Sequence, residues 1–217
     1  MKRFAALATM SLALGLPASL MASDAPSGAP AGLLDPSKDK PGLAVGDAAP
    51  RLTLKDGSGN TVALGDLYAK GPVVVTFYRG GWCPFCTKAL KDWNGKAPEF
   101  EKAGATLVFI TAETAESAKE TGEKNAANLR IVSDADGSAA KAFRVAFAMP
   151  PGDQEKYKGY GVDLSRKNAS GRWELPAPGT FVVDKSGVVT FASADWDYKK
   201  RVDPAEVMEA VKKAAAR

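Results

Sequence analysis

Two stretches of the chain are continuously apolar and stand out from the mixed pattern around them. Residues 72–78 and 106–111 are rich in β-branched and aromatic side chains, which is typical of central strands buried on both faces. Between these runs, apolar side chains recur at helical spacing on one face: Leu90, Trp93, Ala97 and Phe100. The pattern predicts a β-α-β unit with parallel strands and a right-handed crossover. Pro98 is expected to kink or restart the helix.

Other elements are predicted on both sides of this unit. Strand-like segments on either side of turn residues indicate two hairpins. A short apolar run indicates a third strand, and two further segments favour helices. Asp203 and Pro204 form the N-cap and first position of the last helix. We expect an α/β fold with a mixed central sheet, a parallel centre, a hairpin edge and helices on both faces. The segments are a hairpin at 51–64, a helix at 113–127, a strand at 129–132, a surface insertion at 150–178, a hairpin at 180–192 and a helix at 203–216.

The first 44 residues differ in composition and hydrophobic pattern from the remainder. Lys2 and Arg3 precede an apolar run over 4–16, and small residues follow up to Ala22, a pattern typical of a secretory leader. The run is too short to span a bilayer comfortably, although an uncleaved anchoring helix is the alternative. We therefore expect a signal peptide at 1–22, a flexible linker at 23–44 and the folded domain at 45–217. The mature protein is expected to be exported, to a periplasm or the extracellular medium, with no stable membrane span after cleavage.

Composition narrows the possible chemistry. The 217 residues carry a net charge of +4 and contain no histidine and two cysteines. The mild charge gives little reason to expect nucleic acid as a partner. The absence of histidine excludes Ser-His-Asp and Cys-His nucleophile systems and histidine metal ligands. Carboxylates, lysines and the two sulfurs remain.

Cys83 and Cys86 lie where the first apolar run ends and the predicted helix begins. Unpaired N–H groups and the helix dipole lower the pKa of a thiol at this position. Pro84 suits the first helical turn, and Gly80 and Gly81 allow a close approach by a substrate backbone. A redox-active dithiol is favoured over three alternatives. A structural disulfide across so short a loop stabilises little, a metal site has too few soft ligands, and haem attachment lacks its histidine.

Several segments of the chain resemble a known superfamily and one of its families. Residues 72–78 followed by Trp82-Cys83-Pro84-Phe85-Cys86 are similar to the active-site strand and helix of thioredoxin-like proteins, and residues 177–187 to their cis-proline loop and hairpin. More closely, residues 78–86 together with residues 173–176 and 197–201 resemble the peroxiredoxin-like branch of the alkyl hydroperoxide reductase/thiol-specific antioxidant family. The resemblance implies a thioredoxin-like fold and thiol redox chemistry without a cofactor or metal. It also implies that Pro178 lies beside the cysteines and presents backbone to a thiol partner, and that Trp82 packs over the sulfurs.

The chain departs from both the peroxiredoxin and the thioredoxin sequence patterns. Peroxiredoxins carry a Pro, a Thr and the peroxide-attacking Cys at positions that hold Arg79, Cys83 and Cys86 here, and their distant arginine aligns with Pro178. Thioredoxins carry a buried Asp where this chain has Phe77. Arg79 is either a replacement for the missing positive charge or a solvated loop residue.

Three functional hypotheses follow. The leading one is an exported thiol oxidoreductase with an antioxidant or redox-homeostasis role, in which Cys83 is the exposed, low-pKa nucleophile and Cys86 resolves; its partner is a thiol reductant or a disulfide-bearing protein. The alternative is a thiol peroxidase that reduces hydrogen peroxide or organic hydroperoxides, with Cys86 oxidised to a sulfenic acid and Cys83 condensing with it. The third is a non-catalytic binding module on the same fold.

Overall fold

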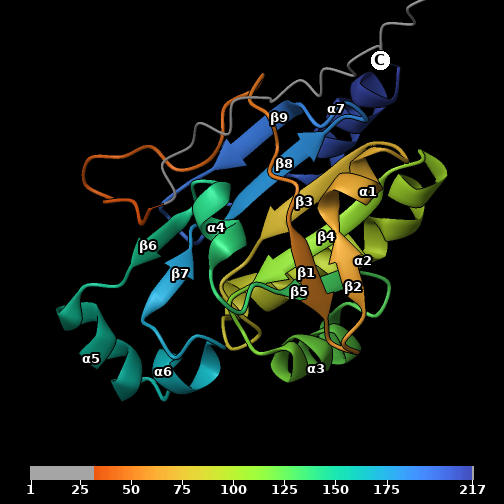
Figure 1. Cartoon of the computed structure of the whole chain (residues 1–217). Helices are drawn as coiled ribbons and strands as arrows, with labels where there is room; N and C mark the ends of the chain where they lie inside the picture. Colours follow the sequence, from red (N-terminus) through yellow and green to blue (C-terminus); the bar gives the residue numbers. More distant parts are fainter. Residues whose placement is uncertain (1–31, 217) are drawn as a thin grey trace, which may run out of the picture.

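A seven-stranded mixed sheet forms the centre of the computed structural model, which describes residues 32–216 (Figure 1). Its strand order is β2-β1-β5-β4-β3-β8-β9. The three central strands are parallel, and an antiparallel pair lies at each edge, so the mixed sheet is as predicted but has two edge hairpins. The strands are β1 (Thr53–Asp56), β2 (Thr61–Ala63), β3 (Val73–Phe77), β4 (Thr106–Thr111), β5 (Arg130–Ser133), β8 (Gly179–Val183) and β9 (Val189–Ala194).

Helices cover both faces of this sheet. Alternate side chains of β3 point to opposite faces: Val73 and Val75 pack with α1 (Leu64–Tyr68) and α4 (Ser138–Ala142). Val74 packs in a second cluster with side chains of the long helices. These are α2 (Pro84–Lys102), α3 (Ala115–Asn125) and α7 (Pro204–Ala215). The two buried clusters explain why the runs at 72–78 and 106–111 carry no polar alternation.

The segment expected as a surface insertion forms a small unit of its own beside the main sheet (Figure 1). A two-stranded antiparallel sheet and two short helices enclose a cluster of Met149, Leu164 and Leu175. Its elements are β6 (Ala146–Ala148), α5 (Pro151–Gly159), α6 (Leu164–Lys167) and β7 (Glu174–Pro176). None of the described side chains of α5 is buried, so this helix is held in place by side chains that are at most partly buried.

Two local expectations need correction. Helix α2 runs through Pro98, so it does not restart there, and the kink stays a prediction. The flexible linker predicted at 23–44 is anchored over its described part, 32–44. There, Leu34 N donates to Ala146 O at 2.8 Å, Gly42 N donates to Arg144 O at 2.7 Å, and Leu43 is buried in the core. These contacts add the segment to the folded unit.

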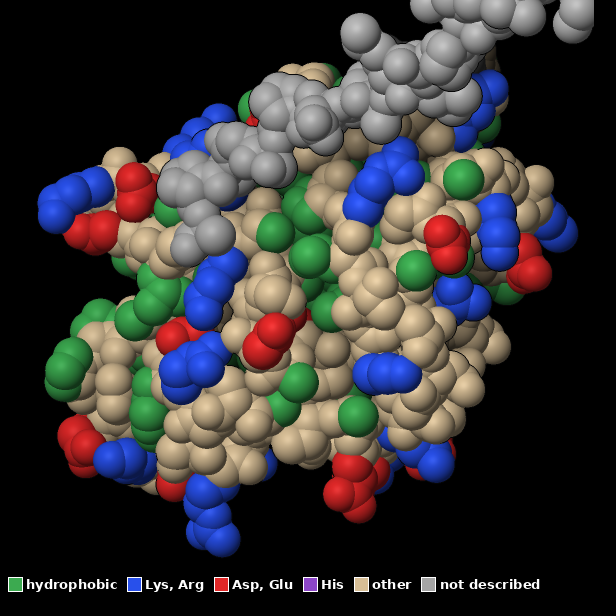
Figure 2. All heavy atoms as spheres, viewed as in Figure 1, with side chains coloured by type: hydrophobic (Ala, Val, Ile, Leu, Met, Phe, Trp, Pro, Cys, Tyr) green, Lys and Arg blue, Asp and Glu red, His purple; other side chains and the backbone are tan. Residues whose placement is uncertain are grey.

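The predicted signal peptide at 1–22 lies outside the described residues. Across 32–216, no helix is long and apolar enough to cross a membrane. On the face seen in Figure 2, basic and acidic side chains are interspersed, without a large patch of one sign.

Candidate active site

The cysteines lie at the junction of β3 and α2, as predicted. Cys83 is the N-cap of α2, Pro84 occupies its first turn, and Cys86 follows one turn in. The backbone N–H groups of Cys86 and Thr87 both donate to Cys83 O at 3.0 Å, which fixes the start of the helix. Both cysteines are free thiols and both are buried, with Cys83 2 % and Cys86 0 % exposed. The expectation that Cys83 is exposed is therefore wrong, because Cys83 belongs to a buried cluster against which Trp82 packs.

The glycines before Cys83 serve packing inside the protein. Gly81 N donates to Glu113 Oε2 at 3.0 Å, and a Cβ on Gly81 would lie 2.0 Å from Thr121 Oγ1. Gly80 has φ +149°, and a Cβ there would lie 2.2 Å from the Trp82 indole nitrogen. The space that we expected a substrate backbone to use is filled by Thr121 and Trp82.

The two thiols share a hydrogen bond that sets their charges. This bond, together with the N–H groups of the first turn and the charge of Arg79, lowers the pKa of Cys83 to about 6 against the opposing effect of burial. The same hydrogen bond, and then burial, raises the pKa of Cys86 well above its ordinary value. The reduced pair at neutral pH is therefore a Cys83 thiolate that accepts the S–H of Cys86.

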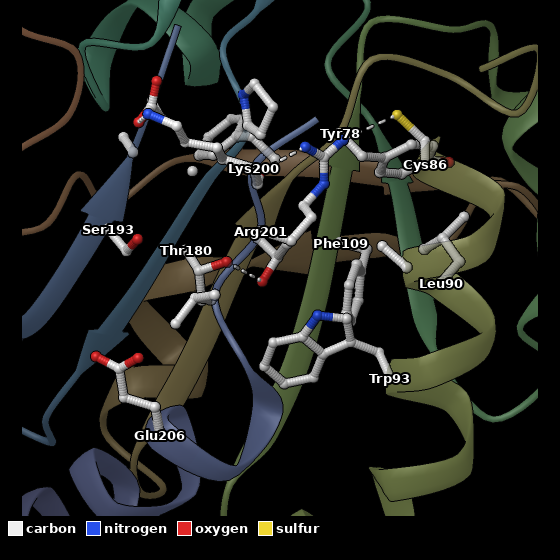
Figure 3. Close-up of a pocket in the computed structure, with 18 residues that line it drawn as sticks. Tyr78, Cys86, Leu90, Trp93, Phe109, Thr180, Ser193, Lys200, Arg201 and Glu206 are labelled. Atoms are coloured by element: carbon white, nitrogen blue, oxygen red, sulfur yellow. Dashed lines mark hydrogen bonds and ion pairs between the residues drawn. The ribbon is translucent and has the colours of Figure 1, made fainter. Parts of the chain in front are cut away.

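An arginine distant in the sequence reaches Cys86. Arg201 lies in the segment between β9 and α7, and its Nη2 donates to Cys86 Sγ at 3.4 Å (Figure 3). The carbonyl oxygens of Tyr198 and Lys200 accept from the same guanidinium. No described carboxylate forms an ion pair with it. Arg201 opposes the rise in the pKa of Cys86. Sequence reasoning named Arg201 only within the motif at 197–201 and assigned it no role.

A cavity of about 280 Å³ opens beside Cys86, between α2, α7 and the sheet. Cys86 lines it and Cys83 does not. In Figure 3, the apolar side chains of Leu90, Trp93 and Phe109 lie on the α2 side, and the Arg201 guanidinium points toward Cys86. Polar side chains on the opposite side of the same view include Thr180, Ser193 and Glu206. The cavity therefore combines an apolar wall with one sulfur, that of Cys86, and the Arg201 guanidinium beside it.

Pro178 lies on the wall of this cavity with Cys86, which agrees with its expected position beside the cysteines. Its expected conformation is wrong, because residues 32–216 contain no cis peptide bond. Its backbone is also occupied within the fold: Pro178 O accepts from Asp195 N at 3.2 Å, and Ala177 N donates to Val145 O at 2.8 Å. These two groups are not free to receive a thiol partner.

Arg79 and Trp82 lie on the other side of the thiols. Arg79 is 3 % exposed, so it is not a solvated loop residue, and it does not line the cavity. Its guanidinium carbon lies 5.2 Å from the centre of the Trp82 ring. Trp82 packs edge-on against Tyr157 at 5.9 Å and against the cluster that contains both cysteines. Trp82 therefore covers the region of the sulfurs, as expected. Within 32–216, no group of three or more His, Cys, Asp or Glu side chains forms a candidate metal site.

Comparisons with known proteins agree with this fold and identify a family. Residues 45–192 match the AhpC/TSA family. The chain is 32 % identical over 149 residues to "Peroxiredoxin Q, chloroplastic" of Oryza sativa subsp. japonica, an alignment that covers 69 % of this chain but 58 % of that relative. It is 30 % identical to "Putative peroxiredoxin MT2597" of Mycobacterium tuberculosis, covering 69 % of this chain and 84 % of the relative.

Solved structures show the same architecture. A structure of Xanthomonas campestris peroxiredoxin Q has a TM-score of 0.59 at 26 % identity and covers 81 % of this chain and 98 % of that one. The peroxidoxin BcpB from M. tuberculosis has a TM-score of 0.61 at 23 % identity, with 79 % and 96 % covered. The thioredoxin-like fold and the family implied by the sequence motifs are thus confirmed. This chain belongs to the AhpC/TSA family.

Proposed function

We propose that this protein is a thiol peroxidase in which Cys86 reduces a hydroperoxide and Cys83 resolves the product. The observation that carries this proposal is the environment of Cys86, the cysteine that lines the cavity, with Arg201 Nη2 at 3.4 Å from its sulfur. The relatives named above are peroxiredoxins by description, which favours this alternative over dithiol exchange as the main activity.

The first step is attack by Cys86 on the peroxide. Transfer of its proton along the hydrogen bond to Cys83 leaves the negative charge on Cys86, where Arg201 stabilises it. The Cys86 sulfur attacks one peroxide oxygen, the O–O bond breaks, and Cys86 becomes a sulfenic acid. The proton held by Cys83 passes to the leaving oxygen, which departs as an alcohol or as water. Cys83 is then a thiolate again.

The second step is condensation. The Cys83 thiolate attacks the sulfur of the sulfenic acid, an S–S bond forms, and hydroxide leaves and is protonated to water. Because the two sulfurs are already in hydrogen-bond contact, this step needs no large rearrangement. The disulfide is returned to the dithiol by two electrons from a thiol reductant of the thioredoxin type.

The cavity favours organic hydroperoxides over hydrogen peroxide alone. Its volume of about 280 Å³ is several times the space of a small molecule such as water, about 30 Å³ in the liquid. Leu90, Trp93 and Phe109 provide an apolar wall that fits an alkyl or aryl group. Cumene hydroperoxide and hydrogen peroxide therefore form an informative substrate pair.

Single-turnover oxidation of cysteine variants tests the proposal. The reduced Cys83→Ser protein should still react with a single equivalent of cumene hydroperoxide and accumulate a sulfenic acid on Cys86, trapped by dimedone, although more slowly than the parent because serine does not accept the Cys86 proton. Cys86→Ser is the matched control and should react no faster than a simple thiol. Peroxide reactivity that survives in Cys86→Ser and is lost in Cys83→Ser contradicts the assignment.

Dithiol exchange is the second candidate, because the pKa of Cys83 lies at about 6 at the start of a helix. Incubation of the reduced protein with a disulfide-bonded model protein separates the two functions. Fast exchange that depends on Cys83, together with slow reaction with both peroxides, would establish exchange and remove the peroxidase. A protein inert toward both classes of substrate, with alkylatable sulfurs, is the binding module.

We also propose that the protein is exported and works in a periplasm or the extracellular medium. The support is the basic start at Lys2 and Arg3, the apolar run over 4–16 and the small residues before Ala22. Expression of the full chain, cell fractionation and N-terminal sequencing test this. A cytoplasmic protein that retains Lys2 contradicts export.

A further inference from the structure

Arg79 is a buried cation without a described carboxylate partner. It is 3 % exposed, its Nε has no hydrogen-bond partner among the described residues, and none of the ion pairs within 32–216 includes it. A guanidinium removed from water needs compensation by an anion or by other strong contacts. The surroundings of Arg79 therefore need a functional explanation.

Three aromatic rings enclose the guanidinium of Arg79. Its central carbon lies 4.2 Å from the ring centre of Tyr198, 5.2 Å from that of Trp82 and 5.3 Å from that of Tyr157. Arg79 also donates a hydrogen bond to the hydroxyl of Tyr157. We call Trp82, Tyr157 and Tyr198 the aromatic box. Rings compensate a buried cation only in part, and they hold its position because they come from three separate segments.

The insertion supplies one wall of the aromatic box. Tyr157 comes from α5, a helix with no buried described side chain, and it contacts both Arg79 and Trp82. Tyr198 comes from the segment that also carries Arg201. The box thus joins the insertion, the loop before Cys83 and the segment after β9 around one charge.

Cys83 lies at the end of the loop that carries Arg79: Cys83 N donates to Gly80 O at 3.1 Å, and Trp82, one ring of the aromatic box, packs against the cluster that contains both cysteines. The charge of Arg79 acts on Cys83 and lowers the pKa of that thiol. Arg201 acts on Cys86. Glu113, the buried carboxyl in the region, accepts from Gly81 N at 3.0 Å and not from Arg79. The titratable and charged groups around the pair are Tyr78, Cys86, Glu113, Tyr157, Tyr198, Lys199 and Arg201.

We propose that Arg79 is the positioning residue that holds Cys83 in its anionic form, and that Tyr157 of the α5 insertion locks Arg79 in place. Each thiolate is then stabilised by a different arginine. Arg201 stabilises that of the attacking Cys86, which lines the cavity, and Arg79 stabilises that of the resolving Cys83, which does not. The part that concerns resolution rests on the proposed peroxidase function, whereas the effect on the Cys83 thiolate does not.

The direct test measures the ionisation of Cys83 in a Cys86→Ser background, by thiolate absorbance or by the rate of alkylation against pH. Arg79→Met should raise the pKa of Cys83 by about one unit or more, the usual size of the effect of a nearby opposite charge. Arg79→Lys should recover part of the shift because it keeps the charge. Arg166→Met is the matched control: it removes an exposed arginine of the same insertion and should leave the Cys83 pKa unchanged.

A second variant keeps the test decisive if Arg79→Met does not fold. Tyr157→Leu removes one ring of the aromatic box from a helix without buried side chains, and it should shift the Cys83 pKa in the same direction by a smaller amount. An unchanged pKa in Tyr157→Leu and in every folded Arg79 variant overturns the proposal. Equal shifts in Arg79→Met and Arg79→Lys also overturn it, because they would assign Arg79 a packing role only.

The resolving step provides the functional readout. In the protein with both cysteines, loss of Arg79 should slow disulfide formation most at acidic pH, about tenfold well below the parent pKa for a shift of one unit. Disulfide formation with an unaltered pH profile contradicts the role in resolution. Because the pKa measurement uses no peroxide, an inactive protein with an Arg79-dependent Cys83 pKa would refute only the peroxidase.

Discussion

Replacement of Arg201 by methionine is the sharpest test of the cavity as the peroxide site. The side chain reaches Cys86 across 115 positions of sequence, and its Nη2 lies 3.4 Å from a sulfur that is 0 % exposed. Methionine keeps most of the apolar stem but leaves the Cys86 thiolate without its cation. A hydrogen bond to a charged group contributes about 1.5–3 kcal/mol, so the rate of Cys86 oxidation should fall about 10- to 150-fold.

The assay follows tryptophan fluorescence by stopped flow in a Cys83→Ser background, so that only the attack by Cys86 is observed. Trp93 lines the cavity and provides a nearby reporter. Lys199→Met is the matched control, because it removes the same charge from an exposed neighbouring position. If Arg201→Met oxidises as fast as Lys199→Met, the guanidinium does not act on the reaction and the assignment of the cavity fails.

Three further predictions concern the pKa of Cys83, the packing at Gly81 and the buried ring of Phe181. Alkylation of the reduced protein by iodoacetamide should be half-maximal near pH 6 and slow below it, because the pKa of Cys83 is lowered to about 6; a midpoint at an ordinary thiol value contradicts this. Gly81→Ala should lose about 1–3 kcal/mol of unfolding free energy in urea, since its Cβ would lie 2.0 Å from Thr121 Oγ1, whereas Gly95→Ala, with open space at its Cβ, should not destabilise the protein. Phe181→Ala removes a fully buried ring from the core and should lower the unfolding free energy by about 3–5 kcal/mol in the same measurement. A loss below about 1 kcal/mol would show that neighbouring side chains close the space left by the ring.

The central part of the fold was predictable because its signals are local. The apolar runs at 72–78 and 106–111 correspond to β3 and β4, whose side chains are buried on both faces. The position of the cysteines follows from the junction between a strand and a helix, which adjacent residues determine. The insertion at 150–178 was located by composition, but its pairing of β6 with β7 was not, because three-residue strands carry too little pattern.

The parts of the site that sequence reasoning missed depend on contacts between distant segments. Arg201 has no periodic signal that connects it with Cys86, and only folding of the segment after β9 brings the two together. For Arg79 the sequence left a replacement positive charge and a solvated loop residue both open, and only side chains from α5 and from residue 198 enclose it. Pro178 was placed correctly beside Cys86, but its peptide bond is not cis.

A chain without histidine must ionise its reactive thiol without an imidazole as general base. Here the S–H of Cys86, the start of α2 and two arginines perform this task for a pair of sulfurs. Arginine stays protonated throughout the accessible pH range, so it stabilises charge but moves no proton. Proton transfer at the pair therefore falls to the thiols themselves. It follows that the acidic limb of the pH–rate profile reports the Cys83–Cys86 pair as one unit, and that removal of either sulfur changes this limb as well as the rate.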